Sequence, residues 1–124
     1  MQRGFQVYKE VCATCHSLNF ISFRNLTDLG FNENEVKAIA AEFQVEDGPN
    51  NEGDMFERAA IPSDMWPSPY PNDNAARASN NGALPPDLSL MVDARAGGAD
   101  YLYALLSGYH ETPQGKEIGE GMYY

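Results

Sequence analysis

The chain has 124 residues, which is enough for one domain and too few for two. Its 18 acidic residues against 8 basic ones give a formal net charge of −10, which argues against nucleic-acid binding because such proteins need a basic face. Hydrophobic residues make up 43% of a chain that is rich in proline and glycine, so a cofactor within the core would help to stabilise so small a domain. No apolar run approaches the length of a membrane span.

Two amphipathic helices are predicted in the first third of the chain. Apolar residues at helical spacing, beginning with Phe5 and Tyr8, predict a helix over residues 3–14. Asn32 and Glu35 form a capping-box pattern that predicts the start of the second helix. Its inner face is predicted to contain, at spacing i, i+3, i+4 and i+7, Val36, Ile39, Ala40 and Phe43.

The character of the sequence changes between residues 44 and 71. This segment is acidic at first and then proline-rich, with Trp66 and Tyr70 between the prolines. Prolines exclude a regular helix there, while the aromatic residues argue against a disordered linker. We therefore predict an ordered loop that wraps over the domain.

Three shorter helices are predicted in the remainder. Asn72 is a suitable cap for a helix through Ala78, which the sequence "NNG" at 80–82 would stop. Residues 88–96 and 100–107 are predicted to be two further helices, separated by Gly97 and Gly98. Strand-like alternation is weak throughout, so the predicted fold class is mostly α with long loops.

The stretch Cys12-Ala-Thr-Cys15-His16 contains the only two cysteines of the chain. A redox dithiol of the thioredoxin type requires a preceding strand, whereas the preceding segment is predicted to be helical. Zinc needs four ligands, and His110 is the only distant histidine. A disulfide between Cys12 and Cys15 would close too short a loop to add much stability. The spacing C-x-x-C-H is typical of covalent c-type haem attachment, which is the favoured interpretation.

A histidine that ligates iron needs an acceptor for its other ring nitrogen, and a backbone carbonyl often provides one. The segment "NGALPPDLS" at 81–89 is a suitable source, because Pro85 and Pro86 fix the backbone there. The alternative is that these prolines only end a loop before a helix.

Several segments together resemble the cytochrome c1 family, the haem subunits of ubiquinol–cytochrome c reductase. The resemblance extends over essentially the whole chain and is carried by "RGFQVYKEVCATCHSL", "VEDGPNNEGDMFERAA", "PYPNDNAARASNNGALPPDLS" and "ARAGGADYLYALLSGY". It implies a cytochrome c-type haem domain and haem c as cofactor. It also implies an electron-transfer role within the complex rather than catalysis by the chain alone.

The resemblance also implies roles for individual residues. Cys12 and Cys15 would form thioethers to the haem, and His16 would be the proximal iron ligand. Arg95 matches an arginine that pairs with a haem propionate; taken by itself, it is an exposed helix charge. The other positions that match the family's haem contacts are Val11, Asn80, Ala83, Pro85, Pro86, Met91, Tyr101, Leu105 and Leu106.

In that family the haem accepts an electron from the Rieske iron–sulfur protein and passes it to cytochrome c, within a complex that also contains cytochrome b. This implies the periplasmic face of a bacterial inner membrane or the mitochondrial intermembrane space. The acidic residues between Glu42 and Glu57 could attract a basic cytochrome c. A solvated loop is the alternative interpretation of that stretch.

The resemblance further implies that a methionine ligand to the iron and a membrane anchor follow after Tyr124. None of Met1, Met55, Met65, Met91 and Met122 matches the ligand position. We therefore expect residues 1–124 to be one partial haem domain. Two other functions stay open at this point: a thiol–disulfide oxidoreductase that uses Cys12 and Cys15, and a free-standing soluble c-type cytochrome.

Overall fold

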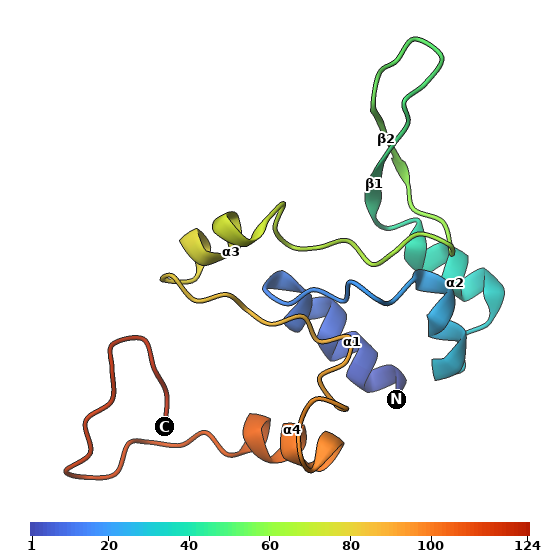
Figure 1. The fold of residues 1–124 in the computed structure, drawn as a ribbon. Coiled ribbons are helices and arrows are strands. Elements are labelled where there is room, and N and C mark those ends of the chain that lie inside the picture. The colour runs from blue at the N-terminus through green and yellow to red at the C-terminus, as the bar shows by residue number, and fades with distance from the viewer. The chain divides into compact units, whose positions relative to one another are not determined.

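The computed structural model describes residues 1–124, which divide into two compact units, Met1–Ser89 and Leu90–Tyr124 (Figure 1). Helices predominate, joined by long loops, and there is one small sheet of two strands. In chain order the elements are α1 (Gln2–Glu10), the 3₁₀ helices η1 (Cys12–Thr14) and η2 (Phe23–Leu29), α2 (Glu33–Ala40), β1 (Gln44–Asp47), β2 (Phe56–Ala59), α3 (Asp73–Ser79) and α4 (Gly98–Ser107). No helix is both long enough and apolar enough to span a membrane.

The first predicted helix is shorter than the sequence suggested. α1 ends at Glu10, and Val11 leaves helical geometry with φ −121° and ψ −64°. The amides of Cys15 and His16 then both donate to the carbonyl oxygen of Cys12, at 3.1 and 2.9 Å. The cysteine–histidine motif therefore lies on a tight 3₁₀ turn after α1 and not within a continuous helix over residues 3–14.

The second predicted helix is confirmed as α2, together with its capping box. The Asn32 side chain accepts hydrogen bonds from the amides of Asn34 and Glu35, and the Glu35 carboxylate accepts one from the Asn32 amide at 2.8 Å. On its inner face Val36 and Ala40 are buried, and Ile39 is partly buried against the same core. Phe43 also packs there, but it lies after the end of the helix at Ala40 and not on the helix as predicted. The capping box fixes where the helix begins and therefore which residues face inward.

The core of the first unit is built around Trp66. Its ring centroid lies 4.8 Å from that of Phe23, 5.0 Å from that of Phe43 and 5.6 Å from that of Phe5. The Trp66 amide also donates to the carbonyl oxygen of Ile21 at 2.8 Å. The proline-rich segment around Trp66 is thus ordered, because it contributes a large buried side chain to the core.

The acidic half of the segment 44–71 is a hairpin, and the prediction of a loop there was wrong. β1 and β2 pair in antiparallel register, from Gln44 opposite Ala59 to Asp47 opposite Phe56. Each strand has only four residues and none is fully buried; β1 alternates only between exposed and partly buried residues, and β2 does not alternate, so the sequence signal of a half-buried strand is weak. Pairing, rather than burial of one face, defines these strands.

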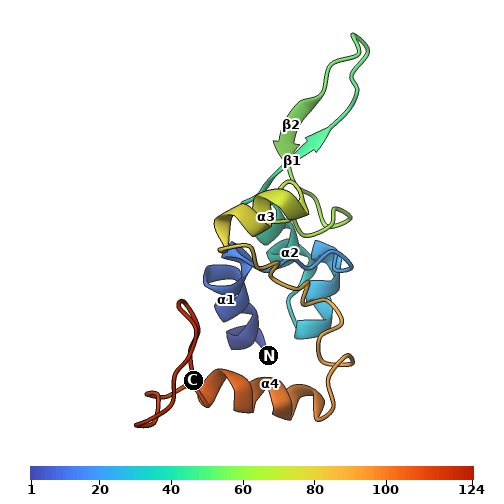
Figure 2. The same ribbon diagram turned by 60° about the vertical axis from the view of Figure 1, so that its left-hand side comes forward.

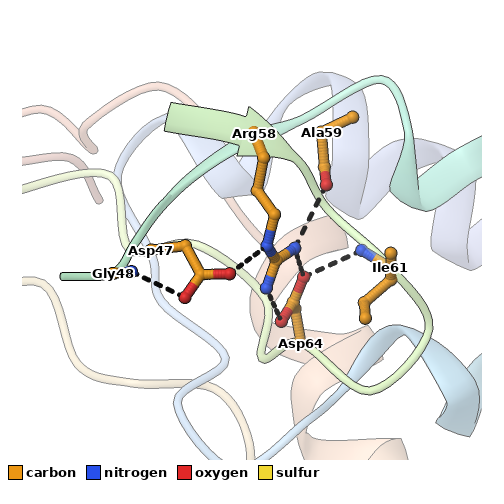
Figure 3. A network of polar contacts seen from close by, with 6 residues as sticks. All are labelled: Asp47, Gly48, Arg58, Ala59, Ile61 and Asp64. Atoms are coloured by element: carbon orange, nitrogen blue, oxygen red, sulfur yellow. Dashed lines mark hydrogen bonds and ion pairs between the residues drawn. The ribbon is translucent and has the colours of Figure 1, made fainter. Parts of the chain in front are cut away.

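Arg58 joins the base of the hairpin to the following loop (Figure 3). Its Nε donates to the Asp47 carboxylate, and Nη1 and Nη2 donate to Asp64 at 2.6 and 3.0 Å. The amides of Gly48 and Ile61 donate to Asp47 and Asp64 respectively. Hydrogen bonds from Arg58, followed by those from the two amides, lower the pKa of both carboxyl groups.

The third predicted helix is confirmed as α3. Asn72 caps it by accepting a hydrogen bond from the Ala75 amide at 3.0 Å. The helix stops where expected, because Asn81 and Gly82 take positive φ angles of 51° and 86° and the Gly82 amide bonds back to Arg77.

The second unit contains one helix, α4, which Figure 2 shows from a second direction. It spans Gly98–Ser107, close to the predicted 100–107. The helix predicted over 88–96 is absent, and that stretch forms irregular turns. Leu88 and Ser89 are instead held by backbone and side-chain bonds to the segment 17–20, and Gly97 has φ +87°, which is not a helical angle.

Candidate functional site

The two cysteines lie at the first residue of the turn η1 and at the residue directly after it. Both thiols are free and partly exposed. Because the Cys15 and His16 amides share the Cys12 carbonyl, the three residues of the motif are fixed relative to one another by hydrogen bonds. Two accessible thiols on one turn can form two bonds to neighbouring substituents of a single planar molecule.

The His16 ring is oriented by a carbonyl seventy residues away. Its Nδ1 lies 2.8 Å from the carbonyl oxygen of Pro86, as the sequence led us to expect. A carbonyl oxygen can only accept a hydrogen bond, so Nδ1 carries the proton and donates. With the proton on Nδ1, Nε2 is the ring nitrogen that can offer a lone pair to a metal.

Tyr8 holds the backbone of the same histidine. Tyr8 lies in the last turn of α1, and its hydroxyl donates to the His16 carbonyl oxygen at 2.9 Å. Burial, and then the charges of Asp87 and Cys12, raise the pKa of Tyr8 to about 12. The hydroxyl is therefore protonated and able to donate at every physiological pH.

The segment that carries Pro86 is tied to the segment after His16. The Leu88 amide donates to the Ser17 carbonyl oxygen at 2.9 Å, and the Phe20 amide donates to the Ser89 hydroxyl at 3.1 Å. Asp87 accepts further hydrogen bonds from this neighbourhood. Burial raises the pKa of the Asp87 carboxyl, but hydrogen bonds from Asn19, Ser89 and Ser17 together outweigh it, and the pKa lies below the ordinary value.

A cavity of about 490 Å³ opens beside Cys15 and lies wholly within the first unit. Pro85 and Pro86 form part of its wall, with Tyr70 and Ala76. Asn80 does not line it: its side chain donates to the Ala76 carbonyl oxygen at 2.7 Å and to the Tyr70 hydroxyl at 3.1 Å, so it stabilises the loop after α3. Ala83 and Val11 are exposed on the same unit.

The remaining predicted contact residues belong to the second unit. Arg95 is exposed and forms no salt bridge; its one side-chain hydrogen bond is to the carbonyl oxygen of Ala94, at 3.0 Å. Met91 is partly buried within that unit. Tyr101, Leu105 and Leu106 are exposed on α4.

The side chains around His16 fit a covalent haem better than a bare metal ion. Nowhere in the chain do three His, Cys, Asp or Glu side chains come together in a way that could hold an ion. Two thiols and one imidazole whose Nε2 is free match the needs of a haem, which brings four nitrogen ligands of its own. Zinc requires all four ligands from the protein in a structural site, and this donor set does not provide them.

Comparison with known proteins decides the family. The model of the Cytochrome C1 family matches residues 1–124. The chain belongs to the cytochrome c1 family. A potato (Solanum tuberosum) protein named "Cytochrome c1-2, heme protein, mitochondrial" is 53% identical over 124 residues, which are 100% of this chain and 48% of the relative.

Other members of the cytochrome c1 family show the same extent of similarity. The Schizosaccharomyces pombe protein "Cytochrome c1, heme protein, mitochondrial" is 56% identical over 98% of this chain and 40% of its own length. "Cytochrome c1" of Rhodospirillum rubrum is 52% identical over 94% of this chain and 43% of its own length. The chain thus spans less than half the length of these relatives.

Two residues that hold His16 and the Pro86 segment were not predicted from the sequence. Tyr8 was assigned only to the apolar face of α1, although it lies one helical turn before Cys12. Asp87 follows the two prolines. An Asp in a turn often accepts a hydrogen bond from the amide two residues further on, as Asp87 does from Ser89. That local pattern could have indicated a turn, but not the bonds to Ser17 and Asn19.

Proposed function

We propose that this chain holds a covalent haem c and transfers single electrons as the haem-binding part of a cytochrome c1. The observation that carries the proposal is the 2.8 Å contact between His16 Nδ1 and the Pro86 carbonyl oxygen, directly after two free thiols on one turn. This arrangement supplies a ring of fixed tautomer together with two attachment points. When bound, the haem supplies an iron that alternates between the ferrous and ferric states.

The motif residues have separate roles in this proposal. Cys12 and Cys15 would hold the haem through two thioether bonds, each formed when an S–H group adds across a vinyl group of the porphyrin. His16 would offer Nε2 to the haem iron, and the hydrogen bond to Pro86 would increase the basicity of the ring. Ligand identity and hydrogen bonding to the ligand are two of the means by which a protein sets a haem potential.

We also propose that the remaining positions matched by the family resemblance contact the haem. A guanidinium stays charged and can grip a propionate with two hydrogen bonds, so Arg95 is assigned to a propionate. Apolar side chains would exclude water from the porphyrin faces. The positions other than Arg95 that are proposed to contact the haem are Val11, Asn80, Ala83, Pro85, Pro86, Met91, Tyr101, Leu105 and Leu106.

The proposed electron donor is a Rieske iron–sulfur protein and the acceptor is a cytochrome c, with cytochrome b as a further neighbour in the complex. The proposed location is the mitochondrial intermembrane space or the periplasmic face of a bacterial inner membrane. Support comes from the net charge of −10 and from the hairpin, where the exposed acids Glu46, Glu52, Asp54 and Glu57 form no ion pair. Such a surface attracts a basic partner and speeds encounter at low salt.

A stopped-flow experiment tests the proposed function. The haem-loaded chain is reduced without oxygen and mixed with oxidised, basic cytochrome c, while the absorption bands of both haems are followed. We expect rapid electron transfer that slows steeply as the salt concentration rises, and oxidised chain should be reduced by a reduced Rieske domain. Failure to exchange electrons with either protein would contradict the proposal.

The haem-free and haem-loaded forms of the chain distinguish the two other functions. A thiol–disulfide oxidoreductase would reduce a disulfide substrate in the haem-free state, and it would lose that activity in C12S and C15S variants. A free-standing cytochrome would accept electrons from general donors but would show no preference for a Rieske protein.

A further inference from the structure

Asp87 is the most connected side chain near the proposed iron ligand. Its Oδ2 accepts hydrogen bonds from the Ser17 hydroxyl at 2.8 Å and the Asn19 amide at 2.7 Å. Its Oδ1 accepts one from the Ser89 amide at 2.9 Å. The carboxylate therefore joins the segment directly after His16 to the segment directly after Pro86.

The Pro86 carbonyl has few other means of being held in place. Neither Pro85 nor Pro86 has an amide N–H, so neither can donate a backbone hydrogen bond. Pro86 is also exposed, which leaves little packing to fix it. The first residue after this carbonyl that can be anchored is Asp87, and it is anchored to both sides of the contact.

The geometry also explains why the residue is an aspartate. Every polar group that the carboxylate meets is a donor: the backbone amides of Asn19 and Ser89 and the hydroxyls of Ser17 and Ser89. A carboxylate is an acceptor at both oxygens, whereas an asparagine would turn its NH₂ group towards one of these donors in either orientation. Asp87→Asn is thus nearly the same size but is mismatched in hydrogen bonding.

We propose that Asp87 is a positioning residue, which holds the Pro86 carbonyl against His16 Nδ1 and thereby fixes the orientation and tautomer of the ring. This rests on the proposed function, because positioning matters only if His16 ligates iron. Asp87 acts through Pro86 and does not contact the haem in this scheme. It would affect the ligand, and not merely the stability of the loop.

The test compares Asp87→Asn with Asp28→Asn. The control makes the same change of charge at an exposed aspartate in η2, whose side chain takes no part in the contacts of residues 85–89. Two readouts use the haem-free chain: hydrogen exchange of the Leu88 and Phe20 amides, and the ¹⁵N shifts of the His16 ring, which report its tautomer. A third uses the haem-loaded chain: exchange of the His16 Nδ1 proton.

In Asp87→Asn we expect exchange of both amides and of the ring proton to rise about tenfold, the effect of losing one well-formed hydrogen bond. The ring should also become a mixture of tautomers, and Asp28→Asn should match the unaltered chain. Unchanged ring shifts and ring-proton exchange in Asp87→Asn would overturn the proposal, even if the amides exchanged faster. Trp66 fluorescence shows whether the core is folded, since Trp66 is buried in that core.

A second variant covers the case in which Asp87→Asn does not fold. Ser89→Ala removes the hydroxyl that accepts from the Phe20 amide and changes no charge. It should increase the exchange rate of the ring proton by a smaller factor than Asp87→Asn does, and no change there would contradict the proposal.

If the unaltered chain acquires no haem, the proposed function fails, while the positioning role is still judged from the two haem-free readouts.

Discussion

The ring nitrogen Nδ1 of His16 lies 2.8 Å from the carbonyl oxygen of Pro86, and the Tyr8 hydroxyl lies 2.9 Å from the carbonyl oxygen of His16 itself. The His16 side chain is thus held by the segment that contains Pro86, and the His16 backbone is held by Tyr8 in α1. This restraint leaves Nε2 as the only free ring nitrogen. A preset ligand of this kind loses little freedom when it binds a metal.

Replacing His16 by alanine tests its role as the axial ligand. We expect the magnetic and optical signature of imidazole ligation to be lost completely from the haem-loaded chain. The control is His110→Ala, because His110 is the only other histidine and stacks on Tyr124 in the second unit. Electron paramagnetic resonance measures the ligation, and retention of imidazole ligation in H16A would contradict the assignment.

Replacing Phe23 tests the core that supports the site. Phe23 is fully buried against Trp66, so Phe23→Ala should reduce the free energy of unfolding by about 3–5 kcal/mol. Phe20→Ala is the matched control, because Phe20 is 67% exposed and its loss should change stability by less than about 0.5 kcal/mol. Urea denaturation followed by circular dichroism measures both. Equal effects of the two substitutions would show that the core is assigned wrongly.

Tyr8 should contribute to stability up to high pH. Its pKa is raised from 10.0 to about 12, so folding favours the protonated hydroxyl. The contribution is fully present below pH 10.0 and is lost as the pH rises through about 12. Tyr8→Phe should lower the free energy of unfolding by about 1 kcal/mol at neutral pH, with a difference that shrinks in strong alkali.

The control for Tyr8 is Tyr103→Phe, because Tyr103 is 77% exposed on α4. Stability against urea at a series of pH values measures both variants. If the difference between Tyr8→Phe and the unaltered chain grew in alkali, the Tyr8 hydroxyl would not be held in its protonated form by folding.

The hairpin should loosen in acid. The pKa values of Asp47 and Asp64 lie below 3.8 because both accept hydrogen bonds from Arg58. Their contribution is therefore present above that pH and is lost as the pH falls through the depressed values. Hydrogen exchange of the β1 and β2 amides should accelerate below pH 3.8 while α2 is less affected.

Arg58→Met should produce the same loosening at neutral pH and weaken its acid dependence, because the hydrogen bonds from the Gly48 and Ile61 amides would remain. Arg24→Met is a matched control, because Arg24 is exposed and belongs to no salt bridge. If the hairpin amides of Arg58→Met were as acid-sensitive as those of the unaltered chain, Arg58 would not be the main group that lowers these pKa values.

Local signals in the sequence predicted much of the fold. Asn32 with Glu35, and Asn72 before α3, act within four residues, so the sequence contains everything that defines those helix starts. The hairpin was missed because its strands are short and exposed and depend on Arg58 reaching Asp47 and Asp64. The helix predicted over 88–96 failed because Leu88 and Ser89 bond to residues 17–20, a contact far away in sequence.

The site divides in the same way. The motif at Cys12, Cys15 and His16 is local and was recognised directly, and the segment with Pro86 was correctly expected to provide the acceptor. Tyr8 and Asp87 were missed because their partners are set by the fold and not by spacing. The haem contacts assigned to Val11, Asn80, Ala83, Pro85, Pro86, Met91, Arg95, Tyr101, Leu105 and Leu106 all remain predictions.

Covalent haem attachment is the property on which the proposed function depends. The chain is produced in a host that attaches c-type haem, unfolded, and studied as its alkaline pyridine complex and by mass spectrometry. We expect one haem bound through two thioethers to the peptide containing Cys12 and Cys15, with single Cys→Ser variants shifting the absorption band to longer wavelength because one vinyl group remains conjugated. A chain that acquires no covalent haem under conditions that load another c-type cytochrome, and that keeps both thiols free, would rule out the proposed function.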